Sequence, residues 1–458
     1  MKKSILAVVI LLLIIASLPS IGNSFIQQSI DERLVELKSF GLDTSKDESI
    51  STYLNTSRHF EFVLKDSQNF LNFLNQYSNK QIPPYVNAML EGVLVGVDIK
   101  YSNLPFAKAF EIEIYPIKLS ENMSETLRIE DMDFYKYTQN FLLEQGILYH
   151  IEYNLLNDDF KGYVKDISES YTLKNDTKLM LLLEKANFKG NGALLAPNEL
   201  SSKVKELHLD VSQGLKSFHV DLSDFKSSSN FESANTYLTN FDVKKILVTL
   251  RGTGDDVNVS IDKFRANASS NAQGETTQLN SKTSISHLEF SSQQSIFTLD
   301  KFNFDVALSG LAKKEYLKFT QLISQKDAMQ TPKSNENLQL SAIELLSKGV
   351  VLDIADFSVE EYSNNSTTPI KGFEIQSKLR LKADKDLVQK IQTSPFLAIP
   401  NISLESELRV SKELYTKLQK INAMLNRFSG YEKEDGDDYV FVLKFIDTKA
   451  SINGKSLN

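Results

Sequence analysis

The chain of 458 residues contains no cysteine and no tryptophan, and it has only 18 glycines and 10 prolines. Without thiols it can form neither disulfides nor thiolate metal sites, and a lipid anchor on a lipoprotein-type cysteine is excluded. Its stability must therefore come from burial of apolar side chains. The low glycine content also leaves few tight loops of the kind that catalytic sites use.

An excess of positive charge is missing as well. The net charge is −8 and the pI is about 5.4, which argues against nucleic acid as a partner because its phosphates require a basic surface. Hydrophobic residues make up 41% of the chain, enough for a sizeable core. We therefore expect a folded protein that does not bind nucleic acid.

Catalytic signatures are absent too. No Gly-x-Ser-x-Gly elbow occurs, and the Ser-x-x-Lys strings at 202–205 and 223–226 lack the companion motifs of penicillin-binding sites. Gly252-Thr-Gly254 lacks the third glycine of a dinucleotide loop, and no Gly-Lys-Ser/Thr string is present. The sequence predicts no catalytic residue, no cofactor and no cofactor-binding residue.

Metal sites are not predicted either. None of the histidine pairs has ligand spacing such as His-x-x-x-His, and His150, His208 and His219 each fall on the polar face of an alternating segment. We expect them at the surface. The acidic run 432–438 lacks the ligand register and closing glutamate of a calcium loop, so a solvated turn is the favoured interpretation.

The N-terminal segment carries a localisation signal. After Lys2 and Lys3 no charged residue occurs before Asp31, and residues 5–16 are continuously apolar. This length lies between a signal peptide and a spanning helix, and Ser20-Ile-Gly22 would suit cleavage. We predict a signal anchor or signal peptide over 1–22, whose membrane-facing residues include Ile5, Leu11, Ile15 and Leu18.

Because the lysines stay in the cytoplasm, this segment directs the remainder of the chain across the inner membrane. The prediction is a single-pass inner-membrane protein with its bulk in the periplasm.

The rest of the chain is predicted in three regions. Residues 23–90 read as amphipathic helices, 91–310 alternate apolar and polar side chains as half-buried strands do, and 311–458 mix helices with strands. Asn191-Gly192 and Asn453-Gly454 are typical of hairpin turns. The predicted fold class is α+β, mainly antiparallel β, with an N-terminal membrane helix, an elongated or curled β-sheet region and C-terminal strand-helix units.

In the last region Gly349 is placed where a helix ends, and Ser411 precedes a helix that carries Leu414, Leu418, Ile421 and Leu425. The strand 373–381 needs an apolar neighbour. We expect this helix to cover it, with Leu418 buried at the contact.

Several segments of this region resemble the bacterial YdgA-like family: residues 342–354, Gly372 with its alternating strand, 402–421, and the ending 446–455. The start is also similar, with one hydrophobic segment, Gly22 and a helix containing 30–33. The resemblance covers about a third of the chain and implies a membrane-anchored, mostly extracytoplasmic protein of a family without a settled function. It implies no site residues.

One short motif suggests a modification. Asp256-Val-Asn258-Val-Ser260 contains an Asn-x-Ser acceptor and resembles the longer acidic sequon of bacterial N-glycosylation. Asn258 is therefore a candidate glycosylation site, although a chance match is favoured.

The sequence leaves two functions open. The first is a non-enzymatic envelope protein that uses one-faced sheets to bind a hydrophobic ligand such as lipid, or a partner protein, because amphipathic strands with little helix must cover their apolar faces somehow. The alternative is a cell-envelope hydrolase with carboxylates that the sequence does not identify. The lack of a nucleophile or metal signature favours the first.

Overall fold

The computed structural model describes residues 27–457, except 29, 33, 78–88, 105–108, 195, 234, 253, 255, 273, 294, 324–331 and 366–367. The chain divides into two compact units, Met1–Leu207 and His208–Asn458. The predicted anchor at 1–22, with Ile5, Leu11, Ile15 and Leu18, lies outside the described residues. No helix within the described ranges is long and apolar enough to cross a bilayer.

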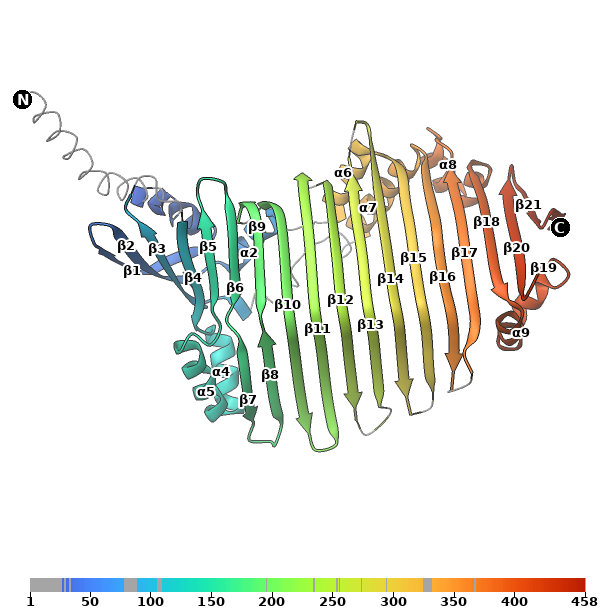
Figure 1. Cartoon of the computed structure of the whole chain (residues 1–458). Coiled ribbons are helices and arrows are strands. Elements are labelled where there is room, and N and C mark those ends of the chain that lie inside the picture. The colour runs from blue at the N-terminus through green and yellow to red at the C-terminus, as the bar shows by residue number, and fades with distance from the viewer. Residues whose placement is uncertain are drawn as a thin grey trace, which may run out of the picture. The chain divides into compact units, whose positions relative to one another are not determined.

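The first unit is an antiparallel meander (Figure 1). Its strands pair in the order β1, β2, β3, β4, β5, β6, β9 and β10, and β7 and β8 form a hairpin whose strand β8 also pairs with β10. The strand bounds are β1 Leu42–Ser51, β2 Asn55–Leu64, β3 Leu94–Ser102, β4 Ala109–Lys118, β5 Tyr149–Asn154, β6 Asp159–Val164, β7 Ile167–Thr172, β8 Lys178–Glu184, β9 Ala186–Ala193 and β10 Ala196–Gln213.

Two predictions for this unit hold only in part. The region 23–90 contains the expected helix α2 (Ser67–Tyr77), but also β1, a mostly exposed and polar strand without an apolar pattern, and β2. Conversely, helices α4 (Glu121–Glu130) and α5 (Met132–Leu143) interrupt the region predicted as strands. Ser120 and Asp131 cap them by accepting backbone N–H hydrogen bonds, which satisfies donors that the first helical turn leaves free.

The second unit is also antiparallel and has longer strands. Each strand from β11 to β18 pairs with the next, and β20 then pairs with β18, β19 and β21. The bounds are β11 Lys216–Ser233, β12 Thr236–Arg251, β13 Val257–Asn271, β14 Thr276–Ser292, β15 Ile296–Ala312, β16 Val350–Asn364, β17 Ile370–Leu381, β18 Ile402–Ser411, β19 Lys433–Asp435, β20 Asp438–Ile446, β21 Lys449–Ile452 and β22 Lys455–Ser456.

Apolar side chains of the second unit form rows that cross its strands. One row pairs Val220 with Val248, Val248 with Val259, Val259 with Phe290, and Phe290 with Phe297. Because successive residues of a strand point to opposite faces, one face of the sheet is apolar and the other carries the polar side chains. The predicted one-faced strands are confirmed here.

The alternation of apolar and polar side chains changes phase within the long strands, as β11 shows. Apolar residues occupy even positions up to Leu222 on β11 and odd positions from Phe225 onward, and the residue between these phases, Asp224, has φ +50°. Lys263 on β13 and Lys301 on β15 have the same left-handed backbone at the corresponding points, with φ +53° and +50°. Across these residues the side-chain alternation shifts by one residue.

The pairing register is unchanged on either side of this row, as in Ser223 with Lys245 and Lys226 with Asp242. An extra residue on both strands of a pair has this effect, and it returns the apolar set to the same face. On β16 and β17, Tyr362 and Phe373 lie on opposite sides of the irregular row and both pack on one apolar cluster. Gly372 belongs to this row, where a Cβ atom would lie 2.1 Å from the Val359 carbonyl oxygen.

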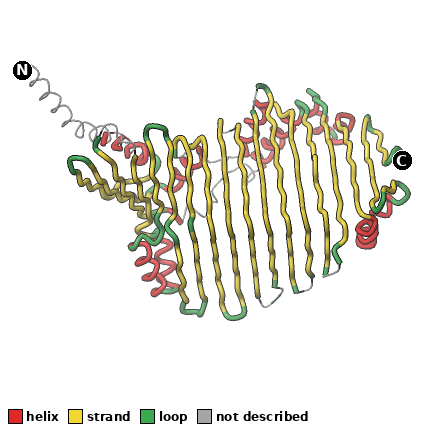
Figure 2. Tube along the Cα trace, in the orientation of Figure 1, coloured by secondary structure: helices red, strands yellow, loops and turns green. Residues whose placement is uncertain are grey.

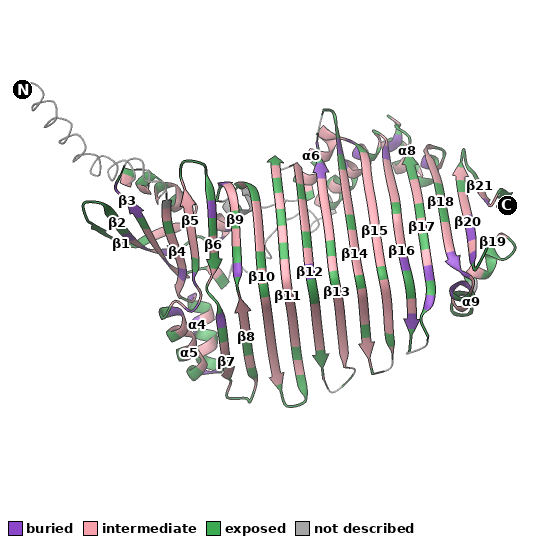
Figure 3. Ribbon diagram, in the orientation of Figure 1, coloured by how far each residue is buried: buried purple, intermediate pink, exposed green. Residues whose placement is uncertain are grey.

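Helices cover only parts of this unit (Figure 2). Helices α6 (Lys313–Ile323) and α7 (Pro332–Leu346) contact β15, where Leu311, Leu345 and Val350 form a small buried cluster. Elsewhere β11 to β15 are mostly half-exposed, as Figure 3 shows. Phe218, Leu250 and Phe290 keep at least 36% of their surface exposed. The apolar face is therefore covered unevenly by the described part of the chain.

The helix α9 (Lys412–Ile421) packs on β17, β18 and β20. The prediction that this helix covers the strand 373–381, which is part of β17, is therefore confirmed. Its buried contact residues are Leu414 and Tyr415, which join the cluster around Val410, Phe441 and Ile452. Leu418, expected at the contact, is 39% exposed. The expectation that Leu418 is buried is wrong: it lies one turn beyond Leu414 on the same face of the helix and borders a cavity instead of a close contact.

We expect Leu414→Asp to lower the free energy of unfolding by about 3–5 kcal/mol, because it places an unpaired carboxylate in this cluster. Ile421→Asp on the same helix is the control: Ile421 is 78% exposed, so its change should stay within about 0.5 kcal/mol. Urea unfolding followed by circular dichroism measures both. Equal losses in the two variants would contradict the packing described.

Candidate functional site

A cavity of about 440 Å³ lies in the second unit between the sheet and the segment formed by α9 and the 3₁₀ helix η2 (Ala423–Phe428). This volume is within the range of roughly 300–1,000 Å³ typical of ligand pockets. We call it the α9 pocket. It is lined by Phe357, Phe373, Ile375, Ser406, Leu408, Val410, Tyr415, Leu418, Leu425, Phe428, Phe441, Leu443 and Ile452.

The two hydroxyl groups in this lining are engaged by the protein itself. Tyr415 Oη lies 3.4 Å from both the Leu425 carbonyl oxygen and a Glu432 carboxylate oxygen, and it donates toward them. Burial, reinforced by Glu432, raises the pKa of Tyr415, so the hydroxyl stays protonated. Ser406 Oγ donates to the Gln376 carbonyl oxygen at 3.3 Å. The wall that remains is apolar and suits an apolar occupant.

The sequence builds the outer wall of the pocket with two caps. Ser411 Oγ accepts from the Leu414 backbone N–H at 3.2 Å and starts α9, as predicted. Asn422 has extended backbone, ends α9 and accepts from the Met424 N–H at 3.0 Å to start η2. The predicted single helix through Leu425 is therefore two helical segments, and the break at Asn422 sets the shape of the wall.

Apolar side chains also line the mouth of the α9 pocket. Leu418 and Phe428 line the cavity and are 39% and 38% exposed, while the neighbouring Ile421 and Met424 are 78% and 62% exposed. Exposed apolar groups beside a cavity are typical of ligand or membrane interaction surfaces. An apolar ligand can therefore enter from this side.

The acidic run 432–438 next to the pocket forms the hairpin of β19 and β20, with Gly436 at φ +62° in its turn. Glu434 and Asp435 are exposed and pair with Lys412 and Arg409 at 2.7 and 2.6 Å. The predicted solvated turn is correct for these two residues. It is wrong for Asp438, whose side chain is 5% exposed and binds Lys371 Nζ through both oxygens at 2.6 and 2.8 Å.

All five histidines of the chain lie near carboxylates. His59 bonds Asp98 at 2.8 Å and His287 bonds Asp300 at 2.7 Å, while His150 Nδ1 lies 3.5 Å from Glu113. His208 and His219 share Asp221. These side chains are on the polar face as expected, but they are half-buried rather than solvated, since the exposed fractions of His150, His208 and His219 are 15%, 20% and 22%.

Asn258 lies near the start of β13 on the polar face, and its side-chain oxygen accepts from Thr249 Oγ1 at 2.8 Å. Its glycosylation stays a prediction. The α9 pocket itself was not predicted as a site. The alternation of apolar and polar residues predicts that its sheet residues lie in strands. It does not predict that they border a cavity, because the space between α9 and the sheet depends on how distant segments pack.

In comparisons with protein-family models, curated proteins and solved structures, the chain matches none. The resemblance to the YdgA-like family stays a prediction.

The hairpin leads to one expectation about stability. Lys371→Met should lower the free energy of unfolding by about 1–3 kcal/mol, because the buried Asp438 carboxylate loses its hydrogen-bonded cation and keeps only Arg409 at 3.8 Å. Lys318→Met is the control, since Lys318 pairs with the exposed Glu344 and should change stability by no more than about 0.5 kcal/mol. Urea unfolding distinguishes them; indistinguishable variants would mean that the Asp438 pair is not structural.

Proposed function

We propose that this chain is a non-enzymatic envelope protein that holds an apolar ligand, the acyl chain of a lipid, in the α9 pocket. The observation that carries the proposal is the pocket lining, in which the hydroxyls of Tyr415 and Ser406 bond to the protein and every other side chain is apolar. A pocket of this kind can hold a hydrocarbon chain by burial alone.

The exposed residues at the mouth support a lipid over a polar metabolite. Leu418 and Phe428 line the cavity and stay 39% and 38% exposed, so a lipid headgroup would remain in solvent while the chain enters past Leu418. The half-covered apolar face of β11 to β15 is a further surface that apolar molecules could contact. We place the pocket ahead of this face because it encloses its occupant on several sides.

The N-terminal segment supports a location at the inner membrane, whose lipids would supply the ligand. Its two lysines and the apolar run 5–16 favour insertion into the inner membrane with the bulk of the chain in the periplasm. In this proposal the membrane is the chain's partner, both as anchor and as the origin of the ligand, and no cofactor is involved.

The absence of tryptophan allows a direct test of the pocket. Leu443→Trp places a single indole in the lining, and Leu215→Trp places one at a position that is 86% exposed. Phosphatidylcholine with brominated acyl chains, which quench indole fluorescence on contact, is titrated into both. We expect saturable quenching of the Leu443→Trp variant and little quenching of the Leu215→Trp control.

Mass spectrometry of the wild-type protein extracted under mild conditions complements this titration, and we expect co-purified lipid. Equal quenching in both variants, or no lipid in the wild type, would remove the lipid proposal. A scaffold for a protein partner would then be the better account.

The topology is tested separately. Protease added to intact spheroplasts should degrade the chain beyond about residue 25, and fractionation should place it with the inner membrane, because the basic start holds the N-terminus in the cytoplasm. A soluble product that begins near Asn23 would show a cleaved signal instead. A protected chain would contradict the extracytoplasmic location.

A further inference from the structure

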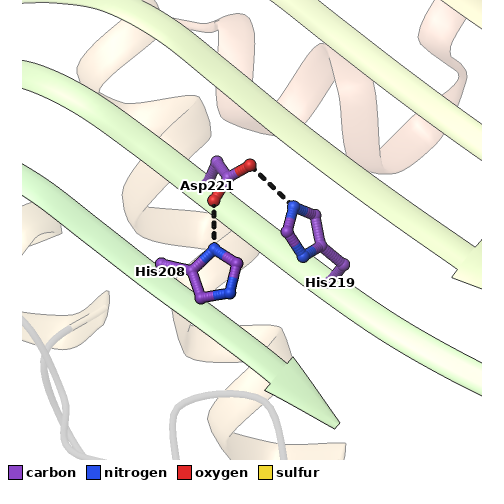
Figure 4. A group of neighbouring side chains, drawn as sticks. All are labelled: His208, His219 and Asp221. Carbon is purple, nitrogen blue, oxygen red and sulfur yellow. Dashed lines mark hydrogen bonds and ion pairs between the residues drawn. The ribbon is translucent and has the colours of Figure 1, made fainter. Parts of the chain in front are cut away.

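On the polar face of the second unit, His208, His219 and Asp221 point toward one another (Figure 4). His208 comes from the part of β10 that belongs to this unit, and the other two occupy alternate positions of β11, so they share one face. Asp221 accepts from both imidazoles: His208 Nδ1 lies 2.6 Å from its Oδ1, and His219 Nε2 lies 2.6 Å from its Oδ2. The ring centroids are 4.7 Å apart.

We propose that these three side chains bind a divalent first-row transition metal ion, Zn²⁺ by their chemistry, with water completing the coordination. Each offers one ligand atom, and the three atoms lie within 4.8 Å of one another. Ligand atoms around a tetrahedral Zn²⁺ with bonds of 2.0–2.1 Å are roughly 3.4 Å apart, so modest side-chain rotations close the site.

The donor set selects the class of ion. Two imidazoles and one carboxylate suit Zn²⁺ and its first-row neighbours, whereas Ca²⁺ and Mg²⁺ prefer oxygen ligands alone. The Asp221 carboxylate presents one oxygen to each imidazole, so it can serve as the third ligand.

A second carboxylate supports the site from outside. Asp210 Oδ2 lies 3.5 Å from His219 Nδ1, the ring nitrogen that faces away from Asp221. A metal-bound histidine commonly donates its other N–H to a carboxylate, which fixes the ring and raises its basicity. When Nε2 binds the ion, the His219 proton resides on Nδ1 and points to Asp210, so the imidazole stays neutral.

The partial exposure of the three side chains and the grouping of their ligand atoms also favour a metal site here. The side chains of His208, His219 and Asp221 are 20%, 22% and 36% exposed, so they are held by their surroundings and still reachable by an ion. Within the described ranges, this is the group of histidine and carboxylate side chains that brings three ligand atoms together. The pairs at His59 and His287 each contain a single histidine.

The test uses the full chain in mild detergent, stripped of metal with a chelator, and calorimetric titration with Zn²⁺. We expect one ion per chain, and visible absorption bands of a tetrahedral N/O site when Co²⁺ replaces Zn²⁺. His208→Asn and His219→Asn should each lower the affinity at least about 10-fold, and Asp210→Asn about 10-fold or more through the loss of His219 orientation. His287→Asn, which removes a histidine from a similar pair, should leave the affinity unchanged.

Melting temperatures give a second readout, since Zn²⁺ should raise that of the wild type and not that of His219→Asn. If His208→Asn fails to fold, Asp221→Asn takes its place in the comparison. The proposal is overturned if the wild type shows no saturable Zn²⁺ binding, or if His219→Asn binds Zn²⁺ as tightly as the wild type.

Discussion

The structure depends on keeping the apolar side chains of long antiparallel strands on one face. Strands such as β11 and β14 are 18 and 17 residues long. Their apolar side chains stay on one face only if the alternation remains in phase with that of the neighbouring strands along the whole length. The left-handed residues Asp224, Lys263 and Lys301 mark the row where the alternation changes phase. Because the register is preserved through this row, the cross-strand apolar rows continue on one side.

The apolar face of these strands must be shielded from water, and different segments of the chain do this to different extents. Helices α6 and α7 pack on β15, whereas α9 is anchored through Leu414 and Tyr415 but leaves a cavity beside Leu418 and Leu425. The apolar walls of this open cavity face solvent instead of other side chains, which forfeits burial and dispersion contacts. An apolar ligand restores those contacts, which connects the architecture of the sheet to the lipid-binding proposal.

The polar face is organised by charge pairing rather than by burial. Cross-strand pairs such as Lys282 with Asp305 and Arg265 with Asp242 lie between directly opposed residues, and the histidine-carboxylate pairs follow the same rule. The cluster around Asp221 differs because two histidines meet one carboxylate while Asp210 stands behind His219. This convergence is what makes a metal site conceivable on a surface otherwise made of isolated pairs.

The sequence by itself determined the elements whose signal is local. Alternation predicted the strands from Val257 onward, Gly349 takes the left-handed backbone expected after α7, and Ser411 caps α9. Exceptions follow from competing local signals: the Asn191-Gly192 pair lies inside β9 instead of forming a turn, and the caps at Ser120 and Asp131 start helices within a strand-rich region. Composition also set the chemistry, since a chain without cysteine must use imidazole and carboxylate for any zinc site.

Only the tertiary structure decided which distant residues meet. His208 and Asp221 are 13 positions apart and show no ligand spacing, yet the pairing of neighbouring strands brings them to 2.6 Å. The α9 pocket likewise gathers residues from Phe357 to Ile452, and the distance of each turn of α9 from the sheet decides that Leu414 is buried while Leu418 is 39% exposed. Periodicity fixes which side chains share a face, but the register between strands and the packing of helices fix what each face encloses.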